Sequence, residues 1–96
     1  MPTKVIGLIQ LLDSTAFDKY RSQVGDTVSA FGGEIVFRGA PCLMPWNDLG
    51  CSDFDAVVEI EFPDETSARA WAASPAYQAL LPIRSQAMKL TLFLAK

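Results

Sequence analysis

Hydrophobic residues along the chain follow two different spacings, and together these spacings predict six elements in the order β-α-β-β-α-β. The first segment, Thr3 to Leu12, is apolar on both faces of an extended chain, interrupted by Lys4 and Gln10. A strand with one face in water alternates cleanly between apolar and polar residues. We therefore expect this strand to lie centrally in its sheet, with both faces covered.

The second segment predicts an amphipathic helix that begins after Asp13, whose side chain can accept hydrogen bonds from the free amides of the first turn. Apolar residues then recur at spacings of three and four, as one face of a helix requires: Phe17, Tyr20, Val24, Val28 and Phe31. Gly32-Gly33 is expected to end the helix, because glycine adopts the left-handed conformation that often follows a helix most easily.

Three later stretches alternate with the two-residue period of strands. They are Glu34 to Arg38, Phe54 to Phe62 and Lys89 to Leu94. In the first of them, the alternation places Ile35 and Phe37 on one face and Arg38 on the other. Between the first two lies an irregular loop, Ala40 to Asp53, which is long for so small a domain, and such loops are usually functional or mobile.

The stretch from Phe62 to Arg84 predicts two short helices. The first begins at Pro63-Asp64 and turns Trp71 inward. Ser74-Pro75 combines a cap with a proline at the first helical position, so a second helix is expected to begin there. Pro82 has no amide hydrogen to donate, and we expect it to kink or end that second helix.

This order of elements predicts one α+β domain over residues 1–96 with a ferredoxin-like fold. Two right-handed β-α-β crossovers give a four-stranded antiparallel sheet with two helices on one face. The other face then carries Val57, Thr91 and Phe93 without cover. A second copy of the chain would cover that face, and the resulting homodimer would be a dimeric α/β barrel. The alternative is a monomer with an apolar open face.

Composition and charge narrow the classes of partner and chemistry. The chain has 96 residues, a net charge of −3 and no histidine. An acidic chain binds phosphate backbones and anionic lipids poorly, so we expect neither nucleic acid nor membrane as a partner. No apolar run is long enough to span a bilayer, so we expect a cytoplasmic location. Without histidine, the commonest metal ligand and the usual general base near neutral pH are missing. We therefore expect no metal and no cofactor.

The chain's two cysteines, Cys42 and Cys51, both lie in the long loop from Ala40 to Asp53. Two cysteines are too few for a disulfide framework, and no second pair completes a thiolate metal site. This arrangement favours reduced thiols in a reducing cytoplasm. A local disulfide bridge is the alternative.

The stretch from Phe62 to Arg84 also resembles the family catalogued as domain of unknown function 1330. The residues that match are Phe62-Pro63, Ala68, Ala70-Trp71, Ser74-Pro75, Tyr77-Gln78, Leu80, Pro82 and Arg84. The resemblance implies membership of the dimeric α/β-barrel superfamily, which includes cofactor-free monooxygenases, isomerases and haem-binding enzymes. It implies no particular activity, since a fold alone does not confer a function. Thr66, Ala72 and Ala76 depart from the Glu, Tyr and Glu that are usual in the family.

Four residues are candidate ligand contacts: Tyr20, Trp46, Tyr77 and Arg84. A buried phenol needs a hydrogen-bond partner, and Tyr77 beside Arg84 could orient the carboxylate of a ligand. For Arg84, a salt bridge to Asp64 or Glu65 is the alternative. Trp46 is interpreted either as a pocket lid or partner contact, or as an apolar plug beneath its own loop.

Two further sets of residues have both a structural and a functional interpretation. Trp71 lies on the inner face of its helix, which favours core packing over stacking on a ligand. Glu59 and Glu61 share a strand face with Val57, and Arg38 could oppose them from the neighbouring strand. Charge pairing is the structural account of these carboxylates, and a general base with a raised pKa is the functional account.

Three functions are compatible with this order of elements. The first is a metal-free enzyme acting on a small, aromatic or acidic metabolite in a pocket between helices and sheet. The second is a non-catalytic small-molecule-binding or structural dimer. The third is a nucleic-acid reader, which the acidic third strand excludes because that role needs basic and stacking aromatic residues there. Convergence of Tyr77, Arg84 and Trp46 on an open cavity would favour the first function, and solid packing the second.

Overall fold

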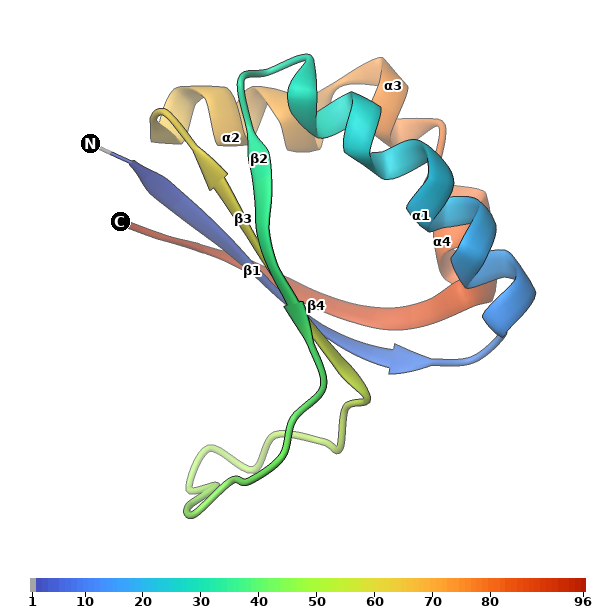
Figure 1. Cartoon of the computed structure of the whole chain (residues 1–96), viewed down its shortest axis with the longest axis vertical. Coiled ribbons are helices and arrows are strands. Elements are labelled where there is room, and N and C mark those ends of the chain that lie inside the picture. The colour runs from blue at the N-terminus through green and yellow to red at the C-terminus, as the bar shows by residue number, and fades with distance from the viewer. Residues whose placement is uncertain (1) are drawn as a thin grey trace.

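The computed structural model describes residues 2–96 and has the predicted order of elements, with the second helical region divided into three (Figure 1). The elements are β1 (Thr3–Leu11), α1 (Ser14–Ser29), β2 (Glu34–Gly39), β3 (Ala56–Phe62), α2 (Glu65–Ala73), α3 (Pro75–Gln78), α4 (Leu81–Ala87) and β4 (Met88–Ala95). The four strands form one antiparallel sheet in the order β2-β3-β1-β4. The prediction of a ferredoxin-like α+β fold is confirmed.

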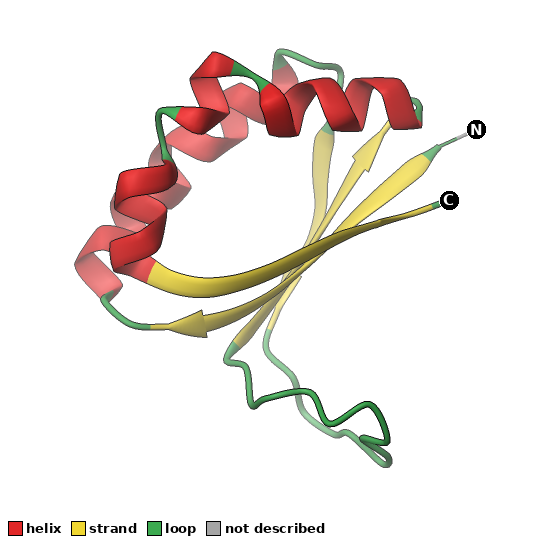
Figure 2. Cartoon of the chain, turned by 180° about the vertical axis from the view of Figure 1, so that it is seen from behind, coloured by secondary structure: helices red, strands yellow, loops and turns green. Residues whose placement is uncertain are grey.

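Strand β1 lies between β3 and β4, the central position that its two apolar faces predict. Val5 of β1 pairs with Ile60 of β3 on one side and with Leu94 of β4 on the other. The helices cover one face of the sheet (Figure 2). The opposite face, which carries Ile6, Leu8, Val57 and Phe93 and is called the open face from here on, has no cover among residues 2–96 (Figure 2).

The hydrophobic core lies between the helices and the covered face of the sheet. From α1 it includes Tyr20, Val24 and Val28, three members of the predicted helix stripe. The ring of Trp71 is 1% exposed, and its centroid lies 4.5 Å from that of Tyr77. The interpretation of Trp71 as a core residue is confirmed.

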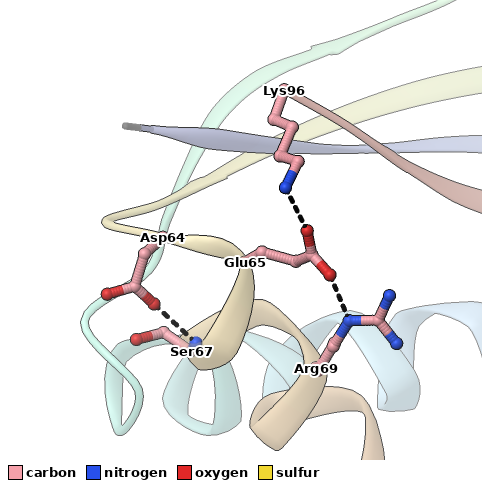
Figure 3. A network of polar contacts seen from close by, with 5 residues as sticks. All are labelled: Asp64, Glu65, Ser67, Arg69 and Lys96. Carbon is pink, nitrogen blue, oxygen red and sulfur yellow. Dashed lines mark hydrogen bonds and ion pairs between the residues drawn. The ribbon is translucent and has the colours of Figure 1, made fainter.

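Both long helices begin where their capping residues predict. The Asp13 carboxylate accepts hydrogen bonds from the amides of Thr15 and Ala16, at 2.9 and 3.1 Å. The Asp64 carboxylate accepts one from the amide of Ser67 at 2.7 Å (Figure 3). This bond to Ser67 lowers the pKa of Asp64, because it stabilises the charged carboxylate at the helix start.

The residue after that cap, Glu65, ties the start of α2 to the end of the chain. Its carboxylate pairs with Lys96, 2.6 Å away, and with Arg69 one helical turn further along (Figure 3). The Lys96 ammonium and then the Arg69 guanidinium lower the pKa of Glu65. Both ion pairs are solvent-accessible, so salt screens them and protonation of Glu65 removes them.

The role expected for Pro82 is wrong. Helix α3 ends at Gln78, and Pro82 is the second residue of a new helix, α4, rather than the point where a helix kinks or ends. Proline is tolerated in the first turn of a helix because its missing amide hydrogen would have no partner there. The new helix turns Arg84 toward α3.

The faces predicted for β2 are also wrong, because the strand contains a bulge. The register shifts between Ile35 and Phe37, which leaves Val36 as an extra residue against β3. Arg38 consequently pairs with Val58 on the helix-covered face, whereas Phe37 lies on the open face. A prediction from strict two-residue alternation cannot detect an inserted residue.

The bulge changes the partner of the carboxylates on β3. On the open face, Lys4 of β1 pairs with Glu59 at 3.3 Å and with Glu61 at 3.7 Å. Arg38 lies on the other face of the sheet and does not oppose them. The structural account of these carboxylates is therefore confirmed, with Lys4 as the cation in place of Arg38.

The long loop between β2 and β3 projects from the end of the sheet opposite α2 (Figure 1). Trp46 in this loop is 81% exposed, so it is not a plug beneath its own loop. Cys42 and Cys51 are exposed free thiols, and the alternative of a disulfide bridge between them is not seen.

Candidate functional site

A cavity of about 300 Å³ lies between α1 and the helix-covered face of the sheet. Its lining is mainly apolar, with Ile9 from β1, Val58 from β3 and Leu90 from β4 on the sheet side and Val24 on the helix side. An apolar hollow with a few polar groups is the usual form of a small-molecule site. This cavity is therefore the candidate functional site of the chain.

Tyr20 brings a buried hydroxyl to this cavity, and it begins a series of hydrogen bonds that crosses three helices. The hydroxyl oxygens of Tyr20 on α1 and Tyr77 on α3 lie 3.0 Å apart. Arg84 on α4 donates from Nη1 to the Tyr77 hydroxyl at 2.8 Å. Three of the four predicted candidates are thus brought together, and only Tyr20 lines the cavity.

Ring packing, in addition to hydrogen bonding, holds Tyr20, Tyr77 and Arg84 in place. The rings of Tyr20 and Tyr77 meet edge to face with centroids 6.5 Å apart, and the Arg84 guanidinium carbon lies 5.7 Å from the Tyr77 centroid. The alternative of a salt bridge from Arg84 to Asp64 or Glu65 is wrong. Both carboxylates are engaged elsewhere, as described above.

Burial determines the protonation of Tyr20. Removal from water raises the pKa of its phenol strongly, because the charged phenolate loses its hydration. The neighbouring Tyr77 raises this pKa further, and the positive charge of Arg84 lowers it in part. A tyrosine with the ordinary pKa near 10 is already neutral at pH 7. The raised pKa keeps the Tyr20 hydroxyl protonated to higher pH, so that it can donate a hydrogen bond to a bound molecule.

Two arginines that the sequence did not identify as ligand contacts, Arg21 and Arg38, also line the cavity. Both are exposed, so they mark its mouth. The guanidinium carbon of Arg21 lies 5.6 Å from the ring centroid of Phe17, which is also part of the lining. Periodicity gave no signal for Arg38, because the bulge in β2 reverses the face on which it lies.

The fourth candidate, Trp46, is not part of this arrangement. It lies in the projecting loop and does not line the cavity. Its expected role as a pocket lid or as a contact with a partner stays a prediction. The loop emerges from the sheet at the end away from α2 (Figure 2).

The chemistry available in the cavity is hydrogen bonding and positive charge. Among residues 2–96, no three His, Cys, Asp or Glu side chains gather closely enough to hold a metal ion. Within the same range, no helix combines the length and the apolar character needed to cross a membrane. The site offers a neutral phenol inside and two guanidinium groups at the mouth.

Comparison with known proteins gives one family and a set of similar folds. A model of the family described as a domain of unknown function, DUF1330, matches residues 4–96. The sequence has no significant match among curated proteins. Three solved structures illustrate the similar folds, and all three are below 25% sequence identity, so they bear on the fold alone.

RPA0582, a protein of unknown function from Rhodopseudomonas palustris, is 21% identical with a TM-score of 0.80, over 99% of this chain and 81% of its own. SnoaB, a cofactor-independent oxygenase from Streptomyces nogalater, is 10% identical with a TM-score of 0.68, over 99% and 91%. A dimeric protein of unknown function with a ferredoxin-like fold from Bacteroides fragilis is 12% identical with a TM-score of 0.59, over 99% and 95%.

Proposed function

We propose that this chain, which belongs to the family of domains of unknown function DUF1330, binds a small organic acid whose apolar body lies between α1 and the sheet. The family has no known function, so the proposal rests on the cavity of the chain itself. The observation that carries this proposal is the placement of Arg21 and Arg38 at the mouth of an apolar cavity of about 300 Å³. An apolar body would fill the cavity, and a carboxylate would meet the guanidinium groups.

The distribution of charge supports an anionic ligand. The chain carries a net charge of −3, with eleven acidic and eight basic residues. Among residues 2–96, the cations in ion pairs are Lys4, Arg69 and Lys96, so neither cavity arginine takes part in one. Arg21 and Arg38 have no carboxylate partner although the chain is acidic, and both lie beside an apolar cavity. They are therefore suited to binding an anionic ligand.

The test is calorimetric titration with benzoates that carry small para substituents, and with the corresponding neutral benzamides. We expect the benzoates to bind at least tenfold more tightly than the benzamides, which is the scale of one charge-assisted hydrogen bond. Arg38→Gln should remove most of this preference. Arg69→Gln, which changes an arginine on α2 outside the cavity, is the matched control and should keep it.

Two outcomes would contradict the proposal. One is that no benzoate binds, and the other is that benzamides bind as tightly as benzoates. Loss of the preference in Arg69→Gln would also count against the cavity, because it would point to the overall charge of the protein rather than to the arginines at the mouth.

A second candidate function is metal-free catalysis at the same cavity. The observation that favours it is the buried hydroxyl of Tyr20 at the cavity wall, which can donate a hydrogen bond to negative charge that develops on a bound molecule. The similar fold of SnoaB, described as a cofactor-independent oxygenase, adds support from analogy alone. Mass spectrometry of ligands incubated in air should then show a product with the native protein and none with Tyr20→Phe. Binding without any product would leave the non-catalytic function.

We also propose that the chain forms a homodimer through the open face of its sheet. Phe37 and Phe93 lie on this face and are 54% and 48% exposed, alongside Ile6, Leu8 and Val57. Exposed apolar side chains grouped on one face in this way are typical of a protein–protein interface. The ion pairs of Lys4 with Glu59 and Glu61 lie on the same face. The protein from Bacteroides fragilis with a similar fold is described as dimeric.

A cytoplasmic location is the last part of the proposal. Cys42 and Cys51 are both exposed and free, and a reducing compartment would keep them so. Reaction of the native, freshly purified protein with a thiol reagent should then count two thiols per chain. One or none would indicate oxidation in the cell.

A further inference from the structure

The hydrogen bonds between Arg84, Tyr77 and Tyr20 have a direction, and arginine sets it. A guanidinium has donors and no acceptor, so the Tyr77 oxygen must accept the bond from Arg84 Nη1 at 2.8 Å. Tyr77 has one hydrogen of its own and is only 3% exposed. Among residues 2–96, the hydroxyl oxygen of Tyr20 at 3.0 Å is the acceptor within its reach.

The direction leaves one hydrogen without a partner inside the protein. If Tyr77 donates to Tyr20, the hydrogen of Tyr20 has to point away from Tyr77. The opposite order would leave the buried Tyr77 hydrogen unpaired, which is unfavourable. Tyr20 lines the cavity, and no other hydrogen-bond partner of its hydroxyl is found among the described residues.

From this geometry we propose that Tyr20 donates a hydrogen bond to a carbonyl oxygen of the ligand, and that Tyr77 and Arg84 are positioning residues that fix the direction of that donation. The inference rests on the proposed binding of an organic acid in the cavity and names its class more closely. The ligand would be a keto acid, with its carboxylate at Arg21 and Arg38 and its carbonyl at the buried end.

The two ends of the cavity differ in burial, and this difference determines which group of the ligand each end can bind. The exposed guanidinium groups at the mouth can meet a carboxylate that keeps part of its hydration. The inner end has apolar walls beside the Tyr20 phenol, and Arg84 donates to Tyr77 and does not line the cavity. A second charge at this end would therefore lose its hydration without a cation in contact. A neutral carbonyl suits this end, because it accepts a hydrogen bond and carries no charge.

The test compares two para-substituted benzoates of similar shape, 4-acetylbenzoate and 4-isopropylbenzoate, of which only the first has a carbonyl. Calorimetric titration should show that native protein binds 4-acetylbenzoate about five- to tenfold more tightly, the scale of one net hydrogen bond. Tyr20→Phe, which keeps the ring, should reduce this ratio to about one. Tyr77→Phe and Arg84→Met should lower the ratio while leaving the affinity for 4-isopropylbenzoate within about twofold.

Arg84→Lys provides the rescue, since its ammonium still donates to Tyr77 and should recover part of the ratio. A residue with a merely structural role would change both affinities together and would not be rescued in the ratio alone. Circular dichroism and thermal unfolding of each variant check that the fold is kept. If Arg84→Met does not fold, the ratio of the two affinities is compared between Arg84→Lys and the native protein instead.

The outcomes separate the two proposals. If neither benzoate binds, the proposed acid-binding function is wrong and this inference is wrong with it. If both bind with equal affinity, or if Tyr20→Phe leaves the ratio unchanged, the acid-binding function stands and the donation by Tyr20 is overturned. Two results together would support donation by Tyr20 under the control of Tyr77 and Arg84. Tyr20→Phe would bind the two benzoates equally, and Arg84→Lys would show a larger preference for 4-acetylbenzoate than Arg84→Met.

Discussion

Trp71 of α2 donates a hydrogen bond from its indole nitrogen to the hydroxyl of Thr27 on α1, 3.0 Å away. Both residues are buried. The Thr27 hydroxyl in turn donates to the carbonyl of Val24 at 2.7 Å, so its oxygen is free to accept from the indole. This contact joins α2 to α1, and α1 forms one wall of the candidate cavity.

The first prediction concerns this contact. Thr27→Val keeps the shape of the side chain and removes the acceptor, which leaves the Trp71 indole hydrogen buried and unpaired. We expect the free energy of unfolding to fall by about 1–3 kcal/mol, the cost of such a group. Urea denaturation followed by tryptophan fluorescence measures it.

The matched control is Thr66→Val, the same substitution at an exposed position of α2. It should change the free energy of unfolding by less than about 0.5 kcal/mol. Equal losses in the two variants would mean that the indole hydrogen bond contributes nothing measurable.

The sequence predicted the fold because its local signals agree with one another. Asp13 and Asp64 mark the helix starts, and the two apolar faces of β1 identify the central strand. Trp71 could be assigned to the core from its place on a helix face. Agreement between caps, periodicity and turn residues is what allows such a prediction.

The candidate site was predicted only in part, and the missing part has a physical cause. Tyr20, Tyr77 and Arg84 were identified because buried phenols and a nearby arginine suggest polar chemistry, and the structure joins them. Arg38 was assigned to the wrong face, because one inserted residue at Val36 reverses every side chain that follows it in the strand. Nothing in the spacing distinguishes a bulge from regular alternation.

The second prediction concerns Glu65, whose pKa is lowered by Lys96 and then by Arg69. A carboxylate with a lowered pKa in the folded state adds stability above its unfolded pKa, near 4.3, and this stability is lost as the pH falls through the folded value. We expect the free energy of unfolding to fall as the pH drops below about 5, and Glu65→Gln to reduce that fall.

The measurement is the urea midpoint of unfolding at a series of acidic pH values, at low and high salt. High salt should weaken the effect, since the pairs are solvent-accessible (Figure 3). Glu34→Gln, at an exposed carboxylate of β2, is the control. The prediction is wrong if the two variants show the same acid dependence.

The third prediction concerns alkaline pH. Burial, and then Tyr77, raise the pKa of Tyr20 above the ordinary value near 10. Above about pH 10 the unfolded chain therefore releases a proton from Tyr20 that the folded protein retains, so stability from this group is intact below pH 10 and declines above it. We expect the urea midpoint of native protein to fall more steeply above pH 10 than that of Tyr20→Phe.

Phenolate absorbance gives an independent reading of the same group. In Tyr77→Phe, Tyr20 is the remaining tyrosine. Its phenolate signal should appear with unfolding rather than near pH 10 in the folded protein, because burial remains the main cause of the raised pKa. A phenolate signal near pH 10 with the fold intact would show that the hydroxyl is in contact with water.

The fourth prediction tests the homodimer. The open face brings Phe93 of β4 beside Ile6 of β1, and a second copy packed on this face would bury both. Sedimentation at micromolar concentration should then give a particle of twice the chain mass of 10.5 kDa. Phe93→Glu should give the single-chain mass, because it places an unpaired charge where the two sheets would meet.

The control is Leu49→Glu, at a side chain in the projecting loop that is 93% exposed. It adds the same charge outside the open face and should leave the mass unchanged. A native protein that sediments as a single chain would overturn the proposal. If Leu49→Glu dissociated the dimer and Phe93→Glu did not, the loop that carries Trp46 would be the interface, and the open face would need another partner.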